Sequence, residues 1–363
     1  MNTRLPIRPE LRGESPYGAP QLDVPVQLNV NENPYAPPSS VVTAIANRVT
    51  AAATHLNRYP DRDFTELRHH LAAYLRTESG VTLRPEQIWA ANGSNEVMLH
   101  LFSAFGGPDR TAASFTPTYS MYPEYARDTH TQWVTAPRRS DFTIDDDAAR
   151  TLVGDAKPSL IVLASPNNPT GTALPLSQVA ALCEAAPDAV IVIDEAYGEF
   201  RSDGTPSALE LLNEHPNLAV TRTMSKAFAA AGLRLGYLAA SQELVDVLRI
   251  VRLPYHLSAV TQAAALAALD SAAVLQEQVA AIRAERDATV AWLKEQGYRV
   301  PDTDANFALF GPHTDRHAVW QGLLDRGVLI RETGPDSMLR VSIGTPQEMA
   351  RFKEALLAVT KEP

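Results

Sequence analysis

The sequence contains one cysteine, few lysines and no long hydrophobic run among its 363 residues. A single cysteine excludes a disulfide framework within the chain, and Cys183 lies in the apolar stretch VAALCEAA, where we expect a core residue. No apolar run reaches membrane-spanning length, and the amino-terminal segment has no apolar stretch of the secretory type. We therefore expect a cytoplasmic protein without a membrane partner.

Acidic residues outnumber basic ones, with 42 Asp and Glu against 32 Lys and Arg, so the formal net charge is -10. No basic run is present, which argues against nucleic acid as a partner. A phosphate or carboxylate ligand would have to be bound by a few basic side chains at specific positions, since the chain as a whole is not positively charged.

Several ligand-binding motifs are missing. The sequence has no GxGxxG after a strand, no GxxxxGK[ST] and no GxSxG, so the usual dinucleotide, nucleotide-triphosphatase and hydrolase sites are unsupported. His313 and His317 have the spacing of metal ligands on a helix. They lie in the polar segment GPHTDRH, which is typical of a solvated helix start, so we expect no metal site.

Alternating strands and helices dominate the chain beyond a proline- and asparagine-rich segment, residues 1–40, which predicts an extended arm. Strand-like apolar runs occur at 88–92, 111–115, 160–165, 189–194 and 217–223, and helical spacing occurs at 41–53, 64–77, 94–105, 119–128 and 176–186. Strands separated by helices predict a mostly parallel sheet in a large α/β domain over residues 41–250.

The rest of the chain, residues 251–363, predicts a smaller α+β domain. A long alanine-rich helical region spans about 258–296; strand-like pieces follow at 306–310, 328–331 and 338–343, with helices at about 315–326 and 346–360. A cleft between two domains is a common place for a small-molecule site.

Polar segments follow four of the predicted strands: NGSNE (92–96), SPNNPTG (165–171), DEAYGEF (194–200) and TMSKAF (223–228). Functional groups of a parallel sheet gather beyond the carboxyl ends of its strands. The four segments together therefore predict one site.

Lys226 is the only one of five lysines that lies among small and apolar residues directly after a strand. Desolvation or a neighbouring cation, such as Arg234, would favour the neutral amine that attacks a carbonyl. Asp194 ends an apolar run and needs a cationic partner, which a protonated pyridine ring would supply. Taken singly, Lys226 also fits a surface lysine, and Asp194 also fits a structural salt bridge.

Anion-binding groups stand nearby. Gly93, Ser94 and Asn95 open a helix, where backbone N–H groups and the helix dipole attract a phosphate. Hydroxyls of Thr223 and Ser225 and the guanidinium of Arg234 add further donors.

At these residues the sequence resembles the fold-type-I pyridoxal-phosphate aminotransferases. SPNNPTG, DEAYGEF, TMSKAF and AGLRLGY carry the resemblance to the cofactor class. NENPY, within LNVNENPYAPP, together with RVSIGT, within LRVSIGTP, makes the chain similar to the histidinol-phosphate branch, and NRYPD belongs to the same overall match. The resemblance covers almost the whole chain. It implies a seven-stranded, mostly parallel sheet in a three-layer αβα domain plus a smaller α+β domain.

The resemblance implies a role for each residue. Lys226 would carry pyridoxal 5'-phosphate as an internal aldimine and move protons, with Asp194 on the pyridinium and Tyr197 on the ring hydroxyl. The other cofactor contacts would be Asn168 at the ring hydroxyl, Tyr119 stacked on the ring, Gly93, Ser94, Asn95, Thr223, Ser225 and Arg234 around the phosphate, and Tyr59 from the second subunit of a homodimer with shared sites.

Substrate contacts are implied as well. Arg340 would hold the substrate anion, helped by Arg331 and by Tyr35 of the arm, and Asn306 would line the cleft. Arg340 also fits a domain-interface ion pair, and Tyr35 also fits packing beside prolines. The implied reaction is amino transfer from L-histidinol phosphate to 2-oxoglutarate, with the substrates bound in turn, as a step of histidine biosynthesis.

Three alternatives remain open at this point. An aromatic-amino-acid aminotransferase would keep every cofactor residue, and so would a lyase such as a threonine-phosphate decarboxylase. A non-catalytic regulator would need a basic DNA-binding domain, for which this acidic chain has no room.

Overall fold

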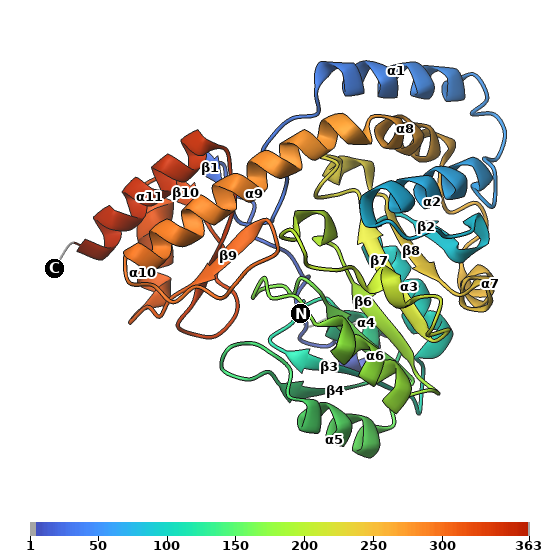
Figure 1. Cartoon of the computed structure of the whole chain (residues 1–363), viewed down its shortest axis with the longest axis horizontal. Helices are drawn as coiled ribbons and strands as arrows, with labels where there is room; N and C mark the ends of the chain where they lie inside the picture. The colour runs from blue at the N-terminus through green and yellow to red at the C-terminus, as the bar shows by residue number, and fades with distance from the viewer. Residues whose placement is uncertain (1–4, 362–363) are drawn as a thin grey trace.

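A seven-stranded sheet forms the centre of the computed structural model, which describes residues 5–361 (Figure 1). The strand order is β2-β8-β7-β6-β5-β3-β4. The strands are β2 (Ile88–Ala91), β3 (Thr111–Thr116), β4 (Gln132–Pro137), β5 (Leu160–Ala164), β6 (Val190–Asp194), β7 (Leu218–Thr223) and β8 (Gly236–Ala240). Of these seven, β8 alone runs against the others. The prediction of a mostly parallel seven-stranded sheet is confirmed.

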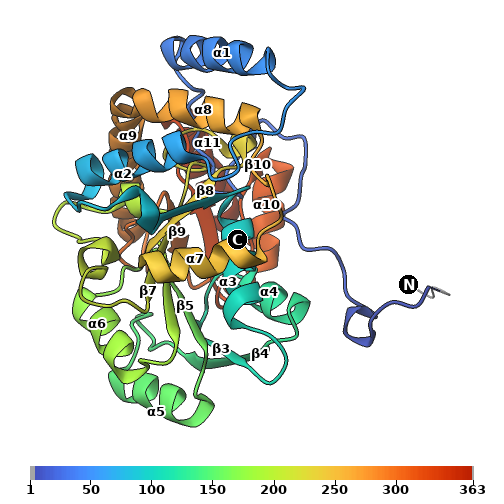
Figure 2. The ribbon, with the colours of Figure 1, turned by 90° about the vertical axis from the view of Figure 1, so that its right-hand side faces the viewer.

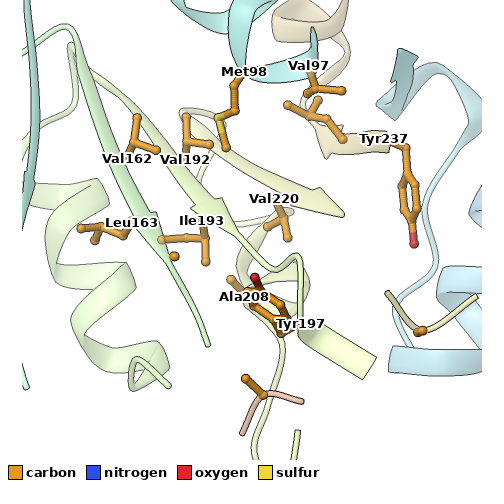
Figure 3. Packing of buried hydrophobic residues seen from close by; sticks show 14 of the residues in the cluster. Val97, Met98, Val162, Leu163, Val192, Ile193, Tyr197, Ala208, Val220 and Tyr237 are labelled. Atoms are coloured by element: carbon orange, nitrogen blue, oxygen red, sulfur yellow. The ribbon is translucent and has the colours of Figure 1, made fainter. Parts of the chain in front are cut away.

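The central strands β5, β6 and β7 are buried along their whole length. Both faces of such strands must be apolar, which explains their nearly continuous runs of Val, Ile and Leu. Figure 3 shows Val162 and Leu163, and likewise Val192 and Ile193, directed to opposite faces of the sheet.

Helices cover both faces of the sheet. One group contains α3 (Ser94–Phe105), α4 (Tyr122–Asp128) and α7 (Gln242–Val251), and the other contains α5 (Asp146–Ala156) and α6 (Leu176–Ala185). Within each group the helices contact one another, and right-handed crossovers between parallel strands place the two groups on opposite faces. The three-layer αβα arrangement is confirmed, and Cys183 on α6 is buried as predicted.

The predicted helical region 258–296 is two helices, α8 (Ala259–Asp270) and α9 (Ala272–Glu295), which meet at an angle of 72°. Ser271 separates them: its N–H caps the end of α8, and its hydroxyl donates to the Ala267 carbonyl. Within the described residues no single helix is long and apolar enough to cross a membrane, and only this bent pair reaches that length and composition together.

Two amino-terminal helices, α1 (Ser39–Ala53) and α2 (Thr65–Ser79), pack against α8. The arm before them runs at the margin of the molecule in Figure 2. Its first four residues, and the last two of the chain, lie outside the described residues. The short 3-10 helices are η1 (Pro9–Leu11), η2 (Pro85–Gln87), η3 (Gly198–Phe200), η4 (Ala208–Leu211) and η5 (Ala231–Leu233).

The carboxyl-terminal part is a smaller α+β unit, as predicted. Its strands are β9 (Phe307–Phe310), β10 (Val328–Leu329) and β11 (Leu339–Ser342), and its helices are α10 (Arg316–Asp325) and α11 (Pro346–Lys361). β9 and β11 pair antiparallel, while β10 pairs in parallel with β1 (Val26–Gln27) of the arm. The arm thus joins the two parts of the chain. The domain limits at residues 40 and 250 stay a prediction.

Candidate active site

A cavity of about 260 Å³ lies beyond the carboxyl ends of β5, β6 and β7. Twelve of the predicted site residues line it: Ser94, Asn95, Tyr119, Asn168, Asp194, Tyr197, Thr223, Ser225, Lys226, Arg234, Arg331 and Arg340. They come from both parts of the chain. The structure therefore brings together residues that are up to 246 positions apart in sequence (340 − 94).

Lys226 follows β7, and its side chain is half-buried. Its Nζ donates a hydrogen bond to the Val30 carbonyl of the arm, at 2.9 Å. Burial, together with the nearby positive charge of Arg340, lowers the pKa of Lys226 to about 8. A larger share of this amine is therefore neutral near neutral pH than for an ordinary lysine.

Asp194 is buried at the end of β6, and no cation of the described residues forms a salt bridge with it. Its Oδ2 accepts a hydrogen bond from Tyr122 Oη and its Oδ1 accepts one from Thr221 Oγ1, both at 2.9 Å. Burial raises the pKa of Asp194 above its ordinary value, although these hydrogen bonds act in the opposite direction. A cationic ligand group would complete this environment.

A chain of hydrogen bonds links the wall of the cavity to the smaller unit. Arg340 Nη1 donates to Asn168 Oδ1 at 2.6 Å, and Asn168 Nδ2 donates to Tyr197 Oη at 3.3 Å. The Tyr197 oxygen also accepts from Asn31 Nδ2 at 3.1 Å. Arg340 Nη2 donates to the Asn29 carbonyl at 2.8 Å, while its buried Nε has no hydrogen-bond partner within residues 5–361.

A second group of donors surrounds the start of α3. Arg234 Nη1 donates to Ser225 Oγ at 3.3 Å, and Thr223 Oγ1 donates to Ser225 Oγ at 3.0 Å. An ideal Cβ on Gly93 would lie 2.7 Å from Arg234 Nη2, and Gly93 has φ +83°. The positive φ favours glycine here, and its missing side chain leaves room for Arg234, so the N–H groups that open α3 stay accessible to an anion.

Four predicted residues do not line the cavity. Gly93 lies behind Arg234, and Asn306 is buried and donates to the Asn31 carbonyl at 3.1 Å, so it supports the arm. Tyr35 is half-buried beside the core. Tyr59 is 79% exposed and stacks on Tyr255, so within one chain it does not reach the site.

The sequence did not single out the arm residues that reach the cavity. Tyr17, Asn29, Val30 and Asn31 all line it, and Tyr17 Oη accepts a hydrogen bond from Ser120 Oγ at 3.0 Å. The alternation of Leu28 and Val30 with Asn29 and Asn31 is a signal of extended chain with one polar face. No local pattern marks Tyr17.

The charges around the cavity are unbalanced. Its lining contains four basic side chains, Lys226, Arg234, Arg331 and Arg340, and one carboxylate, Asp194. In a chain of net charge -10 this is a strong local concentration of positive charge. An anion-binding site for more than one anionic group fits these residues.

Comparison with known proteins agrees with this geometry. Residues 24–356 match the model of the family described as aminotransferase class I and II. The chain belongs to this family. It is 58% identical to the histidinol-phosphate aminotransferase of Bifidobacterium adolescentis and 58% identical to that of Thermobifida fusca, each alignment covering 98% of this chain and 96% of the relative. The predicted membership of the histidinol-phosphate branch is confirmed.

The fold has the same relatives. The crystal structure of a histidinol-phosphate aminotransferase from Sinorhizobium meliloti in complex with pyridoxal-5'-phosphate superimposes with a TM-score of 0.83 at 25% identity. The match covers 93% of this chain and 91% of that one. The fold-type-I architecture predicted for this aminotransferase is therefore confirmed, whereas the roles of single residues stay predictions.

Proposed function

We propose that this chain is a pyridoxal-phosphate-dependent aminotransferase that moves the amino group of L-histidinol phosphate to 2-oxoglutarate in histidine biosynthesis. The observation that carries the substrate class is the pair Arg331 and Arg340. Their backbones exchange two hydrogen bonds of 3.0 Å, both line the cavity, and neither forms a salt bridge within the described residues. Two arginines without a carboxylate partner suit a dianionic phosphate.

The residues at the other side of the cavity fit the cofactor. The opening of α3, Ser225, Thr223 and Arg234 would hold its phosphate, and the buried Asp194 carboxylate, which lacks a cation, would hold a protonated ring nitrogen. Asn168 and Tyr197 would meet the ring hydroxyl, and Tyr119 would pack on the ring face. Bound pyridoxal phosphate supplies an electron sink for chemistry at the substrate carbon.

Lys226 is the proposed general base. Its lowered pKa leaves a neutral amine available near neutral pH, and a lysine so placed can take a proton from a bound amino donor and return it. The acceptor 2-oxoglutarate is also an anion, so Arg340 and Arg331 would bind both substrates in turn. Tyr17 lines the same cavity and is a further candidate contact for the substrate anion.

Assays of the purified, cofactor-loaded protein test this proposal. We expect glutamate formation from L-histidinol phosphate with 2-oxoglutarate, and none from Lys226→Ala, whose fold is checked by circular dichroism. The dephosphorylated donor, L-histidinol, is the matched control. Arg340→Gln and Arg331→Gln should each lower kcat/KM for histidinol phosphate by about tenfold or more, and for histidinol far less.

Two results would contradict the substrate assignment. A higher kcat/KM for phenylalanine than for histidinol phosphate would indicate an aromatic aminotransferase. Release of carbon dioxide from a phosphorylated amino acid would indicate a lyase.

We also propose a homodimer with shared sites, in which Tyr59 reaches the partner's cofactor phosphate. Two adjacent segments around residues 56–63 and 250–262 expose large apolar side chains: Leu56, Tyr59, Ile250, Leu253, Tyr255 and Val260. The Tyr59–Tyr255 stack and the Arg252–Asp63 ion pair hold the segments together. An exposed apolar patch of this kind favours a protein interface.

Analytical ultracentrifugation tests the dimer. The wild type should sediment as a dimer, and Leu253→Asp should sediment as an inactive monomer. Dimeric Tyr59→Ala should bind the cofactor more weakly. A monomeric, fully active wild type would contradict the proposal.

We place the enzyme in the cytoplasm, with small-molecule substrates and without nucleic acid or membrane partners.

A further inference from the structure

Two side chains within residues 5–361 donate hydrogen bonds to the Asp194 carboxylate, and both donors are neutral hydroxyl groups. Thr221 lies directly opposite Asp194 in the pairing of β6 with β7, so the sheet register itself supplies this donor. Tyr122 comes from a different layer, since it opens α4 and lies 72 positions away in sequence. Its contact with Asp194 requires a specific placement of α4 against the sheet.

Tyr122 also touches the proposed ring wall of the cavity. It is fully buried, and its ring packs edge-to-face on Tyr119 with a centroid distance of 5.5 Å and an interplanar angle of 87°. Tyr119 lines the cavity, as Asp194 does. Tyr122, which does not line the cavity, thus contacts both Asp194 and Tyr119, which do.

The protonation states of the pair are complementary. Burial, together with the negative charge of Asp194, raises the pKa of Tyr122 far above its ordinary range, so the phenol keeps its proton and acts as a donor. A hydrogen bond donated to a carboxylate favours its ionised form. Without this donor only Thr221 and the backbone N–H of Ala196 would oppose the effect of burial, so the pKa of Asp194 would rise further and the carboxylate would take up a proton more readily.

We infer that Tyr122 is a positioning residue, whose hydroxyl keeps the Asp194 carboxylate ionised and oriented toward the cavity for a cationic ring nitrogen. The inference rests on the proposed placement of pyridoxal phosphate and adds a residue that does not itself touch the cofactor.

The same helix offers a matched control. Tyr125 lies three positions further on α4 and is also buried, yet its hydroxyl has no hydrogen-bond partner among the described residues. Tyr122→Phe and Tyr125→Phe each remove one buried oxygen from one short helix. Only the first removes a hydrogen bond to Asp194.

The experiment measures ligand binding to cofactor-free protein by isothermal titration. The ligands are pyridoxamine 5'-phosphate, which forms no covalent bond with Lys226, and its 1-deaza analogue, which carries C–H in place of the ring nitrogen. Wild type and Tyr125→Phe should prefer the nitrogen-containing ligand. In Tyr122→Phe this preference should fall by about tenfold or more, with the affinity for the deaza analogue kept within about twofold.

The pH dependence provides a second readout. In Tyr122→Phe, Asp194 takes up a proton more readily, so the preference for the ring nitrogen should disappear at a higher pH than in wild type. A full wild-type preference in Tyr122→Phe, or an equal loss for both ligands, would overturn the inference. A wild type that does not distinguish the two ligands would instead overturn the assignment of Asp194 to the ring nitrogen.

Discussion

Asp194 and Glu195 are neighbouring buried carboxylates at the end of β6, and they differ in their partners. Asp194 accepts hydrogen bonds from the hydroxyls of Tyr122 and Thr221. Glu195 forms salt bridges with Arg222 at 2.7 Å and with Arg201 at 3.1 Å. Burial acts to raise the pKa of both carboxylates. The pKa of Asp194 is raised, whereas the pKa of Glu195 is lowered because the positive charges of the two arginines outweigh the effect of burial.

The alternation of a β-strand explains the difference. Successive side chains point to opposite faces, so Asp194 and Thr221 lie on the cavity side, whereas Glu195 and Arg222 lie on the other. There they join an ionic cluster, which we define as Glu78, Glu195, Glu199, Arg201 and Arg222. At the ends of β6 and β7, the charged side chains on one face therefore form ion pairs with one another. On the cavity face, the Asp194 carboxylate has no ionic partner among the described residues and is available to a cationic ligand.

The largest effect is expected from removing Arg222, one of the two arginines of the ionic cluster. Arg222→Met would leave the buried carboxylates of Glu195 and Glu199, and the partly buried one of Glu78, around a single arginine, and should lower the free energy of unfolding by about 3–5 kcal/mol. Urea unfolding of cofactor-free protein measures this. Arg249→Met, which removes a half-exposed arginine with surface partners, is the control and should cost about 1 kcal/mol or less. A similar cost for both variants would contradict the role of the cluster.

Exchanging the two carboxylates for amides separates function from stability. Asp194→Asn should lower kcat by about 10²–10³-fold, because the group aimed at the ligand cation is lost. Its free energy of unfolding without cofactor should change little, since Asp194 has no ionic partner among the described residues and the hydroxyls of Tyr122 and Thr221 can still hydrogen-bond to an amide. Glu195→Gln should show the reverse, with a loss of stability as its main effect. Equal destabilisation by the two substitutions would remove the distinction between the faces.

A methyl group at residue 198 should disturb the ionic cluster alone. An ideal Cβ on Gly198 would lie 2.7 Å from Arg222 Cζ. Because both atoms are buried, Gly198→Ala should lower the free energy of unfolding by about 1–3 kcal/mol. Gly154 on α5 has open space around it, so Gly154→Ala should leave stability unchanged or slightly higher. Thermal unfolding compares the two, and a stable Gly198→Ala would show that Arg222 can shift freely.

The smallest effect concerns the pH at which Lys226 reacts. Below a pKa of about 8 the amine is mostly protonated, so its rate of reaction with added pyridoxal phosphate should rise with pH, with a midpoint near pH 8. Arg340→Gln removes a positive charge that lowers this pKa, so the midpoint should move to higher pH. Stopped-flow absorbance measures the rate. A midpoint near the ordinary lysine pKa of about 10.4 in wild type would contradict the lowered pKa.

Residues of the site that follow a buried strand were predictable from sequence. Lys226 and Asp194 come directly after apolar runs, and parallel strands end at the same edge of a sheet. Three strands and two α-helices were not predicted: β1, β4, β8, α5 and α7. β4 is a half-exposed edge strand that ends in proline, and β8 is rich in small residues, so neither has a strong apolar pattern.

The hydrogen-bond partners of the site residues could not be predicted from the sequence, because they come from distant parts of the chain. Asn31 bonds to Tyr197 across 166 positions and to Ser342 across 311. Tyr122 approaches Asp194 only when α4 packs on the sheet. No local spacing encodes such contacts. The arm was expected to offer Tyr35, whereas Tyr17 is the arm tyrosine that lines the cavity.

The junction of the arm with β11 has a consequence for synthesis of the protein. Asn29 and Asn31 leave the ribosome 311 residues ahead of Arg340 and Ser342, respectively, to which they are hydrogen-bonded in the folded chain. A growing chain can therefore assemble its parallel sheet and expose Lys226 well before the anion-binding wall exists. A product of premature termination would therefore contain the reactive amine of Lys226 but lack Arg340, the arginine proposed to bind the substrate anion.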